Sequence, residues 1–119
     1  MDIGCGKGGL THVLKRHNNQ ALGIDISGTA IDTARSRYPD IKFDVVDINA
    51  PNLLIEALNN SKAMGDTCVD LVFTSETLSY LENWEEVISI IAHHSRYLLI
   101  SLFIPDDPIG LIKTPDQLQ

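Results

Sequence analysis

The sequence predicts an α/β fold with a doubly wound, mostly parallel sheet. Short apolar segments alternate with amphipathic helical segments, a pattern typical of β-α-β units with right-handed crossovers. Glycines at positions 4, 6, 8 and 9 follow the first apolar residues and predict a tight turn from a strand into a helix. Acidic residues end the next two apolar segments, at Asp25 and Asp47. Ligands of such sheets bind outside the carboxyl ends of the strands, so these ends are the candidate site.

Each further element follows from a local pattern. Helical spacing of Leu10, Val13, Leu14 and His17 predicts the first helix, and Ser27 is a suitable N-cap for the second. The expected helices are 8–18, 28–37 and 83–94, and the expected later strands are 20–26, 41–46, 69–74 and 96–104.

The connections carry weaker signals. Apolar residues between positions 53 and 58 predict a helix of about two turns, after which Asn59, Asn60 and Ser61 favour a surface loop. A short helix or turn is expected over 76–81, and residues 105–119 are expected to form a loop.

Composition narrows the function classes. The 119 residues predict one domain, 1–119, and the net charge of −7 argues against nucleic acid or an anionic membrane as the main partner. Cys5 and Cys68 have no paired spacing, so we expect no metal site and no disulfide. Reduced cysteines and the lack of a recognisable signal peptide indicate a cytoplasmic protein.

The glycine turn is the first candidate binding element. Backbone N–H groups at the start of the following helix would face a ligand above Gly4, Gly6 and Gly8. Asp2 adds a carboxylate, which suits a ligand with a cationic part better than a phosphate. Alternatively, the glycines form only a tight turn.

Two strand-end acids extend this site. Asp25 lies 21 positions after Gly4 and suits a bidentate hydrogen bond to the two hydroxyls of a ribose; alternatively, it caps the following helix. Asp47 can accept a hydrogen bond from an exocyclic amino group, and Ile48 can pack on a base; alternatively, Asp47 belongs to a turn.

Four stretches together resemble the class I S-adenosylmethionine-dependent methyltransferases. They are Asp2-x-Gly4-x-Gly6-x-Gly8, then Gly23-Ile24-Asp25-Ile26-Ser27, then Asp47-Ile48, and then the run from Asp70 to Leu81. The E-x-L-x-Y-L stretch at 76–81 is similar to the nodulation-protein-S-like small-molecule methyltransferases of that class. The resemblance covers residues 1–104 and implies a Rossmann-like sheet of order 3-2-1-4-5.

The resemblance also implies roles at a bound S-adenosylmethionine. Asp2 and the turn from Gly4 through Cys5 to Gly8 would hold its methionine part. Asp25, with Ile26 beside it, would hold the ribose, and Asp47 and Ile48 the adenine. Thr74 to Glu76 would line the methyl-donor end.

Methyl transfer from a sulfonium needs mainly proximity and alignment, with a base only where the nucleophile is protonated. Glu76 and Tyr80 are the candidates for base or substrate anchor. Alternatively, Glu76 begins a helix and Tyr80 packs with a solvated hydroxyl. Asp106 and Asp107 could attract a cationic amine or belong to a solvated turn.

Alternatives to this methyltransferase remain. Gly4-x-Gly6-x-x-Gly9 with Asp25 also fits a nicotinamide-dependent oxidoreductase, although Asp2 would repel a pyrophosphate. Relative to the full methyltransferase fold, the sequence is expected to be truncated at both ends, which favours a non-catalytic cofactor-binding fragment as another alternative. The expected partners are a small-molecule methyl acceptor and, through an exposed sheet edge, a second copy in a homodimer.

Overall fold

The computed structural model describes residues 1–17 and 20–102, which form a five-stranded sheet of order β3-β2-β1-β4-β5. Its strands are β1 (Asp2–Ile3), β2 (Leu22–Asp25), β3 (Lys42–Val45), β4 (Val69–Ser75) and β5 (Ser95–Ser101). All four strand pairings are parallel. The predicted fold class and strand order are therefore confirmed.

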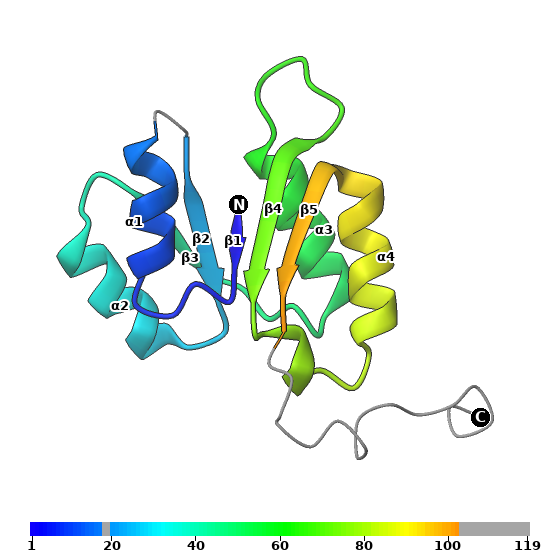
Figure 1. Ribbon diagram of the computed structural model, residues 1–119, viewed down its shortest axis with the longest axis horizontal. Helices are drawn as coiled ribbons and strands as arrows, with labels where there is room; N and C mark the ends of the chain where they lie inside the picture. Colours follow the sequence, from blue (N-terminus) through cyan, green and yellow to red (C-terminus); the bar gives the residue numbers. More distant parts are fainter. Residues whose placement is uncertain (18–19, 103–119) are drawn as a thin grey trace.

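Helices flank the sheet on both sides. They are α1 (Gly9–Arg16), α2 (Gly28–Arg37), α3 (Pro51–Ser61) and α4 (Trp84–His94), and a short 3-10 helix, η1 (Leu78–Tyr80), follows β4. Figure 1 shows α1 and α2 beside the β1–β3 half of the sheet and α3 and α4 beside β4 and β5. The carboxyl ends of the strands lie at one edge, where the glycine turn and η1 also lie.

The buried apolar side chains form two separate clusters, as expected for a sheet covered on both faces. The larger cluster joins the sheet to α3 and α4, and the smaller joins it to α2. The larger contains Met1, Ile3, Ile24, Ile48, Leu54, Leu58, Val69, Val72, Leu78, Val87 and Ile91. The smaller contains Cys5, Ile31, Ala34, Ile41 and Phe43.

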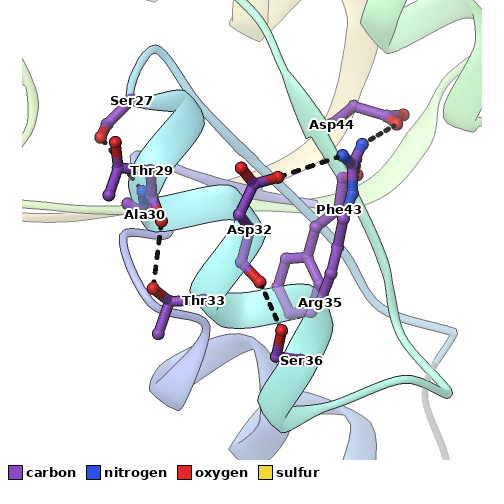
Figure 2. A network of polar contacts seen from close by, with 9 residues as sticks. All are labelled: Ser27, Thr29, Ala30, Asp32, Thr33, Arg35, Ser36, Phe43 and Asp44. Carbon is purple, nitrogen blue, oxygen red and sulfur yellow. Dashed lines mark hydrogen bonds and ion pairs between the residues drawn. The ribbon is translucent and has the colours of Figure 1, made fainter.

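Polar contacts fix α2, which begins three residues after the end of β2 (Figure 2). The Ser27 hydroxyl accepts a hydrogen bond from the Ala30 N–H at 3.2 Å, as the predicted N-cap should. Near the other end, Arg35 donates from Nε and Nη2 to the Phe43 carbonyl at 3.1 and 2.8 Å. The Arg35 bonds thus hold α2 against β3.

The first helix is confirmed as α1, in which the buried residue is Thr11 and Leu10 and Val13 are exposed, because the Thr11 hydroxyl faces Asp2 in β1. One local expectation was wrong. The loop expected from Asn59 to Ser61 is the last turn of α3. Leu54 and Leu58, one helical turn apart, are buried, and their packing stabilises α3 up to and including these polar residues.

Some predictions fall outside the described residues. They are the end of the first helix at position 18, the last two residues of the strand expected over 96–104, the loop over 105–119, and Asp106 and Asp107. Within the described ranges, none of the helices is long and apolar enough to cross a bilayer.

Candidate functional site

A cleft of about 460 Å³ lies at the carboxyl edge of the sheet. It is lined by Gly4, Asp25, Ile26, Ile48, Asn49, Ser75, Glu76, Thr77, Tyr80 and Leu81. A second cleft, of about 390 Å³, lies at the amino ends of the strands, beside Met1, Leu22 and Val69. We take the first as the candidate site, because ligands of parallel sheets bind at the carboxyl ends and several of the predicted residues, among them Asp25, Ile48 and Glu76, line this cleft.

The glycine turn follows β1 and has a left-handed backbone at Gly4, Gly6 and Gly8, with φ of 76°, 53° and 84°. The Gly4 and Cys5 N–H groups both donate to the Ile24 carbonyl, at 2.8 and 3.0 Å. The turn is therefore anchored on β2, and its glycines are required by the backbone conformation.

The three glycines differ in what faces them. A Cβ at Gly4 would lie 1.9 Å from Thr77 Oγ1, and one at Gly8 would lie 2.7 Å from a ring carbon of Phe43. A Cβ at Gly6 would meet nothing within 4 Å. Gly4 and Gly8 thus make room for the protein's own side chains, whereas a side chain at Gly6 would meet no protein atom. Of the three, Gly4 lines the cleft.

Asp25 connects the glycine turn to the cleft. Its Oδ2 accepts from the Gly6 N–H and its Oδ1 from the Ser27 N–H, both at 2.8 Å. The carboxylate therefore makes the contact with the start of α2 that the alternative interpretation expected, and it also lines the cleft. Each oxygen keeps a second lone pair, so the held carboxylate can still accept from a ligand.

A turn follows the end of β3. Asp47 Oδ1 accepts from the Asn49 N–H at 2.9 Å and from Asn49 Nδ2 at 3.0 Å, which is the turn arrangement considered as its alternative. Ile48 is buried. Ile48 and Asn49 both line the cleft, whereas Asp47 is not among the lining residues. Sequence reasoning missed Asn49, although its place in an Asp-x-Asn turn was a usable signal.

Asp2 lies beneath the glycine turn and does not line the cleft. It is only 2% exposed, and its Oδ2 accepts a hydrogen bond from Thr11 Oγ1 at 2.7 Å. Burial raises the pKa of the Asp2 carboxyl, and the Thr11 hydrogen bond opposes part of this rise. Its assignment to the methionine part of a cofactor stays a prediction.

Cys5, Gly6, Gly8 and Thr74, which were also predicted to bind the cofactor, are not among the residues that line the cleft. Burial raises the pKa of the Cys5 thiol to about 12, so this side chain stays a neutral thiol in the core. The Thr74 hydroxyl is buried and is the one such side-chain atom without a hydrogen-bond partner among the described residues. A water or ligand atom would be needed to satisfy it.

The segment after β4 supplies the far wall of the cleft. Glu76 has a left-handed backbone, with φ of 58°, and its N–H donates to the Ser101 carbonyl at 2.7 Å. Glu76 lines the cleft, and so does Tyr80, which is 86% exposed. Asp25 and Glu76 are the charged residues of the lining, so the cleft favours a cationic or neutral group over an anion.

Comparison with known proteins identifies relatives of this arrangement. A family model described as "Methyltransferase domain" matches residues 1–96. Trans-aconitate 2-methyltransferase of Delftia acidovorans is 29% identical over 90 residues, which cover 74% of this chain and 30% of that protein. A protein of Invertebrate iridescent virus 6, also named as a methyltransferase, is 34% identical over 55 residues, covering 44% of this chain and 21% of its own. The chain thus spans less than a third of these curated relatives.

Solved structures share the fold. The magnesium protoporphyrin IX methyltransferase of Synechocystis, solved with SAH bound, matches with a TM-score of 0.66 and 22% identity over 89% of this chain and 46% of its own. A TehB-like SAM-dependent methyltransferase of Corynebacterium glutamicum matches with a TM-score of 0.58 and 22% identity over 79% of this chain and 47% of its own.

Proposed function

The chain belongs to the methyltransferase domain family and has the fold of S-adenosylmethionine-dependent methyltransferases, and on this premise we propose that its cleft binds S-adenosylmethionine for methyl transfer to a small-molecule acceptor. One observation carries the proposal most directly. Asp25 lines the cleft while amides from the glycine turn and from the start of α2 hold both of its oxygens. A carboxylate fixed in this way is prepared to accept hydrogen bonds from two neighbouring hydroxyls.

The residues present suit this cofactor. A volume of about 460 Å³ lies within the range of about 300–1,000 Å³ that small-molecule sites occupy. Asp25 and Ile26 would meet the ribose, and Ile48 and Asn49 would meet the adenine, with Asn49 presenting the polar group next to the predicted Asp47. The methionine part would lie toward Gly6 and above the buried Asp2, whose carboxylate favours a nearby ammonium.

S-adenosylmethionine supplies an activated methyl group on a sulfonium, so the chain mainly has to align it with the acceptor. Glu76 is the candidate base or amine anchor, because its carboxylate stands at the cleft on a fixed backbone. Tyr80 is the second candidate, with its side chain almost fully open to an incoming acceptor. Both roles concern an acceptor with a proton to lose or a positive charge to bind.

The comparisons bear differently on the two alternatives, an oxidoreductase and a non-catalytic cofactor-binding chain. The family model and the relatives named above are methyltransferases, so the nicotinamide-dependent oxidoreductase has no support from the comparisons. A chain that binds the cofactor without turnover is still an alternative, because the chain spans 21% and 30% of the two curated relatives. Acceptor turnover separates these possibilities.

A homodimer in the cytoplasm is the remaining part of the proposal. Leu71 pairs in register with Tyr97, and Phe73 with Leu99, so these side chains share one face of the β4–β5 half. Tyr97 and Leu99 are 68% and 56% exposed, and β5 is the edge strand of the sheet. A second copy would cover this apolar surface, and Leu99→Lys should then abolish a dimer seen by analytical ultracentrifugation.

Calorimetric titration with S-adenosylmethionine tests the cofactor. We expect micromolar binding that Asp25→Ala weakens at least tenfold, with no binding of NAD. Asp32→Ala is the matched control, since this carboxylate lies on the exposed side of α2, 3.8 Å from Arg35 Nη1, and should leave affinity unchanged. A folded chain without affinity for S-adenosylmethionine, or equal affinities for the two Asp variants, would contradict the proposed site.

A further inference from the structure

We propose that Thr77 is a positioning residue that joins the glycine turn to the segment after β4 and so fixes where Glu76 stands across the cleft. The role of Glu76 rests on the proposed function, whereas the joining contact stands on geometry alone. Neither the family match nor the predicted strand-end residues assign any role to Thr77.

The first step is the contact between Thr77 and Gly4. The Thr77 hydroxyl oxygen lies in the space that Gly4 leaves by having no side chain, only 1.9 Å from where a Cβ would be. Thr77 Cβ and Cγ2 would both be 2.8 Å from the same point. The glycine at position 4 therefore serves Thr77, and the two segments pack directly against each other.

The second step is the hydrogen bonding of the same hydroxyl. Thr77 Oγ1 lies 3.3 Å from the Ile3 carbonyl and 3.2 Å from the Ser75 carbonyl, so its single proton is donated to one or shared between both. Ile3 ends β1 and Ser75 ends the neighbouring strand β4, and Thr77 is 74 positions from Ile3 in sequence. One hydroxyl thus joins the carboxyl ends of two strands.

The third step is the consequence for Glu76, which lies between Ser75 and Thr77. A left-handed residue other than glycine persists only where its surroundings hold it. On one side the Glu76 N–H is bonded to Ser101 at 2.7 Å, and on the other Thr77 is fixed against Gly4 and begins η1 through the Tyr80 N–H bond to its carbonyl. Without the hydroxyl contact, Glu76 would lose the link to β1, and the Glu76–Ser101 and Tyr80–Thr77 backbone bonds would remain.

Amide hydrogen exchange measured by NMR tests the joining contact in the whole chain. Thr77→Val keeps the shape and removes the hydroxyl, whereas Thr77→Ser keeps the hydroxyl. We expect exchange of the Glu76 amide to accelerate about threefold to tenfold in the valine variant, the factor that one net hydrogen bond represents, and to stay near wild type in the serine variant. Ser79→Ala, on the exposed side of η1, is the control and should change nothing.

A purely structural effect of the substitution would look different. It would accelerate all amides that open by global unfolding, including that of the fully buried Ile31 in α2, whose N–H donates to the Ser27 carbonyl. The proposal requires acceleration at Glu76 with unchanged exchange at Ile31. If the valine variant does not fold, the serine variant decides: wild-type exchange at Glu76 supports the hydroxyl contact, and fast exchange there overturns it.

Titration with S-adenosylmethionine provides the second readout. We expect the valine variant to bind about threefold to tenfold more weakly and the serine variant to bind as wild type does. Equal affinity and equal Glu76 exchange in the valine variant would overturn the proposal. If even the wild type has no affinity, the proposed function fails, while the exchange data still decide the role of Thr77.

Discussion

Two turns border the same cleft, and both contain residues with a left-handed backbone. The two turns use different residue types at these positions. The turn after β1 uses Gly4, Gly6 and Gly8, for which positive φ carries little strain, whereas the turn after β4 uses Glu76 at a φ of 58°. The difference indicates what each turn supplies. The first offers backbone amides and close packing, and the second holds a particular side chain in place at the expense of conformational strain.

Gly4→Ala should have the largest effect and would break the first turn. The left-handed backbone costs about 1–2 kcal/mol for an alanine. Overpacking against Thr77 adds about 1–3 kcal/mol, because a Cβ at position 4 would lie 1.9 Å from its hydroxyl oxygen. We expect a clearly lower urea midpoint, and a midpoint equal to that of the wild type would contradict the packing at Gly4.

Gly6→Ala is the matched comparison within the same turn. Its φ of 53° is equally left-handed, but a Cβ there meets nothing within 4 Å, so only the backbone cost of about 1–2 kcal/mol applies. The Gly6 N–H holds Asp25 Oδ2 at 2.8 Å, so a strained alanine there should disturb this carboxylate, and affinity for S-adenosylmethionine should fall more than stability does. Loss of stability as large as that of Gly4→Ala would remove the distinction between the two glycines.

Glu76→Gly tests whether the left-handed backbone of the second turn is strained. Glycine relieves a strain of about 1–2 kcal/mol and adds about 0.5–1 kcal/mol of backbone entropy cost, so thermal unfolding should show a small net gain in stability. Glu76→Ala keeps the strain and is the control, with no such gain expected. Both variants should lose methyl transfer if the carboxylate acts on the acceptor. If the alanine variant were more stable than the glycine variant, strain at this position would be contradicted.

The smallest effect should come from Asp2 beneath the first turn. Burial raises its folded-state pKa above the unfolded value of about 3.9, so the folded chain binds more protons than the unfolded chain between these two pKa values. This carboxyl therefore contributes its full stability below the unfolded pKa and loses it as the pH rises through the folded pKa. Urea titrations should show the free energy of unfolding of the wild type falling with pH relative to Asp2→Asn, and a constant difference would contradict the raised pKa.

The sequence was most informative about the order of the strands and about the residues that this order brings to one edge of the sheet. Alternating apolar and helical segments are local patterns, so the fold and the convergence of Gly4, Asp25 and Ile48 at one edge could be predicted. Burial of Asp2 could not, because it depends on which face of α1 meets β1 and thus on the Thr11 hydroxyl. Thr77 was missed for a similar reason, since its contacts with Gly4 and Ile3 join segments distant in sequence.

The hydrogen bond from Glu76 to Ser101 also bears on when the site can form during synthesis. The glycine turn leaves the ribosome first, but Thr77 meets it only after β4 has been made, and Glu76 is held only once β5 has reached its last residue. A nascent chain that ends before Ser101 would therefore carry the turn without its opposite wall. Cofactor capture should consequently report on the arrival of β5 and not on completion of the glycine turn.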